Sequence, residues 1–137
     1  MKTFLGLLLL VALFTACAGE ALKSTREDLL SSITGYNDLL RRGEFDKAKS
    51  FVVESKQAEF DARAKAAQGV KVAEYRLMRT DFETEKGEEI IDVELKYTIS
   101  PGSEVKTLID KQKWSFVYVK EEKKKRWRLF SALPEFK

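Results

Sequence analysis

The side chains best suited to chemistry lie on a long segment near the C-terminus. There Asp110, Gln112 and Trp114 alternate, so they share one face if the segment is a β-strand, because successive strand side chains point to opposite faces. A carboxylate on an otherwise apolar face suits a general base or a hydrogen-bond acceptor in a pocket. Tyr36 and Tyr97, which lie in other apolar-patterned segments, can supply hydroxyl groups to the same pocket. These five residues are the candidate ligand-binding site, without an assigned catalytic residue.

The same pattern also has a purely structural interpretation. A bulge near Asp110 would flip the register, because a one-residue slip turns every strand side chain to the other face. Alternatively, Asp110 and Gln112 lie at an open rim of the sheet and bind water or backbone, since a buried polar group without a partner costs about 1–3 kcal/mol. Trp114 and Trp127 are expected in the core rather than as stacking platforms, because both lie in apolar alternating strands.

Composition argues against several other chemistries. The chain has 137 residues, a formal net charge of +3, one cysteine and no histidine. The absence of histidine removes the commonest metal ligand and the usual proton carrier near neutral pH, so a zinc site would need carboxylates alone. The sequence has no glycine-rich phosphate loop or nucleotide fingerprint. We therefore expect no metal, no cofactor and no nucleic acid partner, and a non-catalytic role rather than an enzyme.

The single cysteine, Cys17, lies at the end of the longest apolar run. Lys2 gives the chain a basic start, and the 15 residues from 4 to 18 carry no charge, which is shorter than the roughly 20 residues of a spanning helix. Small residues then lead to the first acidic residue, Glu20. This order is typical of a secretory signal peptide, and a buried core helix or a short anchor helix is the alternative.

The residues before the cysteine carry a more specific signal. Phe14-Thr15-Ala16-Cys17 resembles the lipobox of bacterial lipoproteins, with Phe14 in place of the usual leucine. The resemblance implies a diacylglycerol on the Cys17 sulfur, cleavage just before this residue, and an acyl chain on the new amine. Ala18 as the next residue implies, in the same family, sorting to the outer membrane. We expect the chain to be lipid-anchored in a bacterial cell envelope, on the outer membrane and facing the periplasm.

The chain thus divides into a signal peptide (1–16), a lipid-anchored tether (17–22) and one domain (23–137). The first half of the domain predicts three amphipathic helices. Ser24 begins an S-x-x-E capping box for the first, which ends at Gly43. A short second helix is expected over residues 45–52. Ser55 is expected to cap a third, which ends at Gly69.

After Gly69 the hydrophobic period changes to two, which predicts β-strands. Four are expected, over residues 70–82, 91–99, 105–120 and 126–132. The first allows a bulge, and a loop around Gly87 and a turn at Pro101-Gly102 separate the next strands. Three helices followed by four hairpin-linked strands predict an α+β fold, with the helices on one face of an antiparallel sheet.

Three segments extend this prediction to a family. GEFDKAKSFV, VKVAEYRL and DKQKWSFVYV…RWRLFSALPEF resemble the nuclear-transport-factor-two-like, or cystatin-like, fold of small bacterial lipoproteins of undefined function. The resemblance covers about residues 22–137. It implies three helices on a curved, cone-shaped sheet whose interior often holds a ligand. Some relatives are isomerases or dehydratases built on an aspartate.

Two functions follow from these features. The first is a lipid-anchored, non-catalytic module that binds a partner protein or a small apolar ligand, and its polar sheet face allows a weak homodimer. The second is an isomerase- or dehydratase-type enzyme that uses Asp110.

The strongest charge feature is the run 120–128, which holds six basic and two acidic residues. It suits contact with anionic headgroups or an acidic partner. We expect the simpler interpretation, a solvated hairpin tip whose lysines discourage edge pairing.

Overall fold

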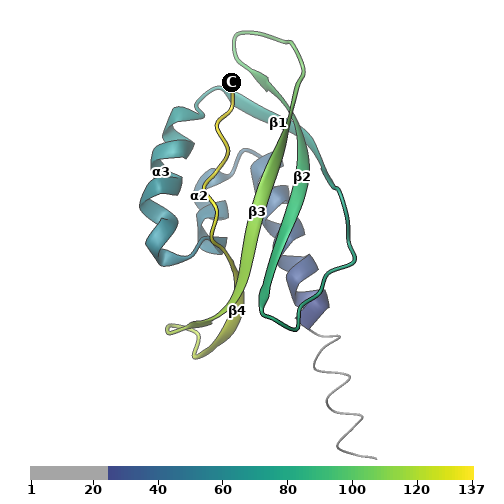
Figure 1. Ribbon diagram of the computed structural model, residues 1–137. Coiled ribbons are helices and arrows are strands. Elements are labelled where there is room, and N and C mark those ends of the chain that lie inside the picture. The colour runs from purple at the N-terminus through teal and green to yellow at the C-terminus, as the bar shows by residue number, and fades with distance from the viewer. Residues whose placement is uncertain (1–24) are drawn as a thin grey trace, which may run out of the picture.

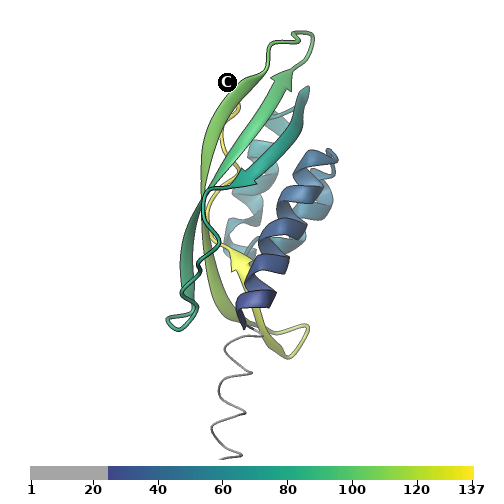
Figure 2. The same ribbon diagram turned by 90° about the vertical axis from the view of Figure 1, so that its right-hand side faces the viewer.

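The computed structural model describes residues 25–137, which form helices packed on one face of a curved four-stranded antiparallel sheet (Figures 1 and 2). This confirms the predicted α+β class. The predicted signal peptide, Cys17 and the predicted capping residue Ser24 lie outside the described residues.

The helices follow one another at the start of the domain. Residues 25–41 form the first helix, which ends before Gly43 at φ +73°, a left-handed conformation that glycine adopts without strain. The remaining helical elements are α2 (Phe45–Ala48), the 3₁₀ turns η1 (Lys49–Phe51) and η2 (Glu54–Lys56), and α3 (Gln57–Ala66).

The predicted cap of the third helix is wrong. Ser55 lies inside η2, and no side-chain hydrogen bond caps α3, whose N-cap residue is Lys56. The 3₁₀ turn brings the chain into the helix through backbone hydrogen bonds, such as that from Lys56 N–H to Val53 O at 2.9 Å. A helix entered in this way has less need of a serine cap.

Four strands form a simple meander in the order β1-β2-β3-β4. They are β1 (Val70–Leu77), β2 (Glu88–Ile99), β3 (Lys106–Val119) and β4 (Lys124–Leu129). The predicted bulge lies between Val72 and Glu74. The first strand ends earlier than predicted, at Leu77, because residues 78–87 form the loop to β2. The last ends at Leu129, beyond which the hydroxyl of Ser131 accepts the hydrogen bond of Lys113 N–H.

The pairing of β2 with β3 decides which way the candidate site faces. Its register is unbroken from Glu88↔Ser115 to Tyr97↔Lys106, so no bulge flips β3 near Asp110. Asp110 is 4% exposed and Gln112 is fully buried. Neither the flipped register nor the open rim is present, and both side chains lie on the helix-covered face.

The core fills the space between the first helix and the inner face of the sheet. Trp114 and Trp127 are 0% and 1% exposed, as core aromatics should be. The extended residues 130–137 run from β4 between α3 and the sheet (Figure 1). Leu133 is fully buried there, and Glu135 pairs with Arg63 of α3 at 3.1 Å. The C-terminal segment therefore completes the core.

Candidate functional site

A buried amide pair joins the first helix to β3. Asn37 is fully buried on the helix face that also carries Ile33 and Leu40. Gln112 Nε2 donates to Asn37 Oδ1 at 2.9 Å, and Asn37 Nδ2 donates back to Gln112 Oε1 at 3.2 Å. Asn37 Nδ2 also donates to Ile33 O at 2.8 Å. These reciprocal hydrogen bonds replace those to water that both side chains lose on burial. A single buried amide would have no such partner.

Gln112 is the centre of this cluster. Its Nε2 also donates to Asp110 Oδ2 at 2.9 Å, and its Oε1 also accepts from Trp114 Nε1 at 3.3 Å. A glutamine amide has two donor hydrogens and one oxygen with two lone pairs. Asn37, Asp110 and Trp114 use all four, so Gln112 has no free group to offer a ligand.

Asp110 is the titratable group of the cluster. Burial raises its pKa from 3.8 to about 6, because a low-dielectric environment disfavours the charged form, and the hydrogen bond from Gln112 partly opposes this effect. A carboxyl group with such a pKa can exchange a proton near neutral pH. To act on a substrate it would also need access, and Asp110 is only 4% exposed.

Tyr36 lies beside this cluster without joining its hydrogen bonds. Its side chain is fully buried, and its hydroxyl has no hydrogen-bond partner among the described residues. Burial raises the pKa of Tyr36, and the charge of Asp110 raises it further. The ring packs edge-on against Trp114 at 5.9 Å and against Phe60 and Phe51 at 6.4 Å each. Aromatic side chains thus fill the space where a pocket was predicted.

Tyr97 does not belong to this cluster. On β2 it lies four residues beyond Val93, the partner of Asp110, which is about 13 Å at the rise of an extended strand. Its hydroxyl donates to Lys137 O at 2.9 Å, and its ring packs on Phe136 at 5.0 Å. The structure therefore brings four of the five predicted residues together. The fifth, Tyr97, instead binds the C-terminal segment.

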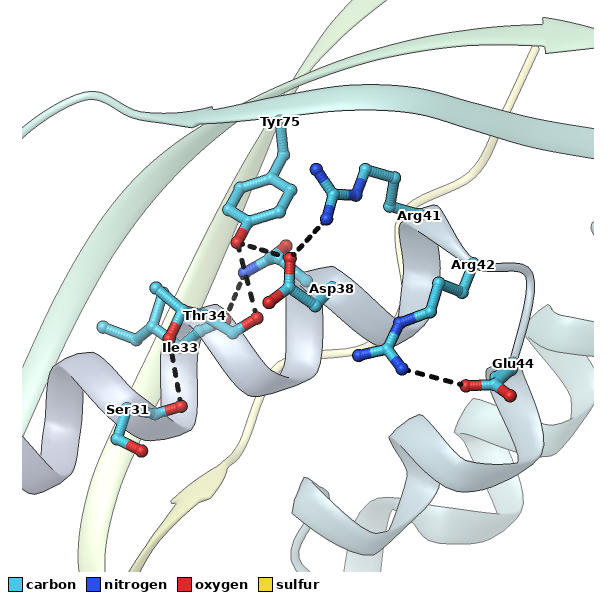
Figure 3. Close-up of polar contacts among 9 residues, drawn as sticks. Ser31, Ile33, Thr34, Asp38, Arg41, Arg42, Glu44 and Tyr75 are labelled. Carbon is cyan, nitrogen blue, oxygen red and sulfur yellow. Dashed lines mark hydrogen bonds and ion pairs between the residues drawn. The ribbon is translucent and has the colours of Figure 1, made fainter.

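A second polar cluster, which the sequence did not reveal, ties the first helix to β1 (Figure 3). Tyr75 Oη donates to Asp38 Oδ1 at 2.9 Å, and Arg41 Nη2 contacts the same oxygen at 3.1 Å. The guanidinium of Arg41 also lies 5.9 Å from the centre of the Tyr75 ring. Partial burial and the hydrogen bond to Asp38 raise the pKa of Tyr75. The i,i+3 spacing of Asp38 and Arg41 in the sequence is compatible with an ion pair on a helix. The contact of Tyr75 with this pair could not be predicted from the sequence.

Five depressions on the surface of residues 25–137, with volumes from about 90 to about 720 Å³, are lined by residues other than Asp110. The largest lies between residues 50–57 and the β3–β4 hairpin, and includes Val52, Val117 and Tyr118. Within residues 25–137, no three acidic or cysteine side chains are grouped to hold a metal ion.

Comparisons with protein-family models, curated proteins and solved structures found no match to this chain. In the part of the chain that the structure describes, no helix is both long enough and apolar enough to cross a membrane. The arguments for function therefore come from the residues themselves.

Proposed function

We propose that this chain is a lipid-anchored protein of the bacterial cell envelope, attached through Cys17 to the outer membrane on its periplasmic side. The resemblance of Phe14-Thr15-Ala16-Cys17 to a lipobox carries this proposal. Each buried methylene contributes about 0.8 kcal/mol to membrane binding, so two or three acyl chains suffice for a stable anchor. Modification also removes the odd thiol that an exported chain would otherwise carry.

The domain of residues 23–137 would act as a non-catalytic binding module for a partner protein or a small apolar ligand. The saturated hydrogen bonding of Gln112 supports a structural role for the polar cluster. The largest of the five depressions, of about 720 Å³, would receive such a ligand on Val52, Val117 and Tyr118, with charged side chains such as Glu54 and Arg128 at its edge. The order of three helices and four strands agrees with the nuclear-transport-factor-two-like, cone-shaped fold, which we propose for this domain.

A weak homodimer through the outer face of the sheet stays a prediction. Ile90 and Ile109 are each 51% exposed on that face. Around them lie ion pairs within the chain, such as Arg76–Glu94 at 3.3 Å. Apolar side chains among paired charges suit a small, transient interface.

The test of the anchor is Cys17→Ser in the full chain, followed by acyl labelling and membrane fractionation. The unchanged protein should incorporate the label, lose residues 1–16 and fractionate with the outer membrane. The serine variant should accumulate as an unlabelled precursor. A serine variant that still matures and stays with the membrane would show that the anchor is wrong.

An isomerase- or dehydratase-type enzyme using Asp110 is the second candidate, because the pKa of about 6 suits proton transfer. Native mass spectrometry of the mature protein, extracted from its own membrane, separates the two. A binding module should retain its partner or ligand equally in the unchanged protein and in Asp110→Asn. Loss of a bound small molecule only in Asp110→Asn would favour the enzyme.

A further inference from the structure

One end of the domain holds both the start of the first helix and the β3–β4 hairpin (Figures 1 and 2). Trp127 of β4 fixes the two together, because its Nε1 donates to Thr25 O at 3.2 Å. We call residues 118–125 the lysine hairpin. Because the chain enters the domain here, this end is the one nearest to the proposed anchor at Cys17.

The lysine hairpin presents positive charge that the rest of the domain does not neutralise. Its four lysines are exposed, and none forms an ion pair with another described residue; they are Lys120, Lys123, Lys124 and Lys125. Glu122 forms ion pairs with Arg126 at 2.6 Å and with Arg128 at 3.4 Å instead. The tip therefore offers four lysines outside ion pairs against one such carboxylate, that of Glu121, and Lys124 helps to lower the pKa of Glu122.

An exposed aromatic residue accompanies these lysines. Tyr118 is 60% exposed and is the strand partner of Lys125. It lies on the same strand face as Trp114, at the edge of the depression that residues 50–57 also line. Tyrosine is enriched at membrane–water interfaces, because its ring suits the acyl boundary and its hydroxyl the headgroups.

The length of chain before the domain keeps this end close to a membrane. Eight residue steps separate Cys17 from Thr25, and even a fully extended chain spans at most about 3.6 Å per residue, or about 29 Å in total. The attraction between a lysine and an anionic surface acts within about 8–10 Å at physiological ionic strength. On so short a tether, this end of the domain repeatedly comes within that distance of the membrane surface.

We propose that the lysine hairpin docks on anionic lipid headgroups of the membrane that anchors the chain, and so sets the orientation of the domain. This inference rests on the proposed anchor at Cys17. Anionic lipid is the partner that the charge of the hairpin, its exposed tyrosine and the short tether to the anchor favour.

The β1–β2 loop provides a comparison within the molecule, because it lies at the same end but carries the opposite charge. Residues 78–87 hold three carboxylates, Asp81, Glu83 and Glu85, against two basic side chains, Arg79 and Lys86, and Arg79 is paired with Glu89 of β2. An anionic surface attracts the hairpin and repels this loop, so the domain should tilt with the hairpin toward the lipid. Tethering alone would bring both close to the same extent.

The experiment places one fluorescent label on the full lipidated protein in vesicles that carry a headgroup-attached quencher. Cys17 is the only cysteine and is occupied by lipid, so Glu121→Cys and Lys86→Cys give unique labelling positions on the hairpin and on the loop. Vesicles of phosphatidylcholine are compared with vesicles that also contain phosphatidylglycerol, at low and high salt. We expect quenching at position 121 that requires phosphatidylglycerol and is lost at high salt, and weak quenching at position 86.

A charge-neutral hairpin measures the contribution of the lysines. Each lysine at an anionic surface changes the ratio of docked to free domain about fivefold, so Lys123→Gln/Lys124→Gln/Lys125→Gln should lower that ratio about 100-fold. The matched control is Lys65→Gln/Lys71→Gln/Lys106→Gln, which removes the same charge from other parts of the domain and should leave the quenching unchanged.

The outcomes separate this proposal from the one on which it rests. A chain that does not float with vesicles of either composition overturns the anchor, and the docking with it. A chain that floats, but shows equal quenching at both positions whatever the lipid or salt, overturns the docking alone. So does a triple hairpin variant that behaves like its control, which would leave the lysines to an acidic protein partner or to solvent.

Discussion

Asp110→Asn should make this protein more stable at neutral pH. Asp110 is 4% exposed, and its pKa is raised from 3.8 to about 6 by burial. The folded protein therefore holds this proton more tightly than the unfolded chain does. Between these two pKa values the folded state binds more protons than the unfolded state, so the free energy of unfolding falls as the pH rises.

The size of the effect follows from the shift. One pKa unit corresponds to about 1.4 kcal/mol, so above pH 6 the buried charge lowers the free energy of unfolding by about 3 kcal/mol compared with the protonated form. The effect is absent below pH 3.8, where both states are protonated. Asparagine keeps an oxygen that accepts the hydrogen bond from Gln112 but cannot ionise. The variant should therefore gain about 2–3 kcal/mol at pH 7, and most of this gain should disappear at pH 4.

The assay is urea denaturation of the unchanged protein and the variant from pH 4 to pH 8. Asp46→Asn, which removes an exposed carboxylate, controls for the change in net charge. The decisive quantity is the difference in free energy of unfolding between variant and unchanged protein, plotted against pH. A flat difference, or an Asp110→Asn protein that is less stable at pH 7, would refute the account, because it would mean that the carboxylate is solvated or paired in the fold.

Three further substitutions test the interior by the same denaturation measurement. Gln112→Leu leaves Asn37, Asp110 and Trp114 without their shared partner and should cost about 3–4 kcal/mol; a loss below 1 kcal/mol would mean that water replaces the amide. Tyr36→Phe removes a buried hydroxyl without a partner and should raise stability by about 1 kcal/mol, whereas a clear loss would reveal a hydrogen bond. Gly43→Ala places a side chain at φ +73° in open space, so strain alone should cost about 1–2 kcal/mol, and an unchanged value would contradict the strain.

Local sequence patterns predicted most of the fold. The alternation in β2 and β3 indicated which side chains share a face, but the register near Asp110 stayed open until the unbroken β2–β3 pairing settled it. Gly43 marked the end of the first helix, since its left-handed backbone favours glycine. The errors lie where backbone geometry, rather than the side-chain pattern, sets the boundary of an element. Examples are the 3₁₀ turn that leads into α3 and the early end of β1.

The candidate site was predicted only in part, because its interactions join distant segments. Asn37 and Gln112 are 75 residues apart, and nothing local links them, although an asparagine on the apolar face of the first helix was a signal that a partner was needed. Tyr97 was placed in the site because it lies on the apolar face of its own strand and carries a hydroxyl group. Its distance along the strand, and the C-terminal segment that binds it, follow only from the three-dimensional arrangement.

The contact between Trp127 and Thr25 has a consequence for the order in which the fold can form during synthesis. It joins residues 102 positions apart, and the fully buried Leu133 lies later still in the chain. A ribosome makes the first helix long before either residue exists, so the helix has no complete sheet to pack against until translation is almost finished. Contacts of such long range also form slowly. A chain with this arrangement cannot complete its core until its last residues have been made.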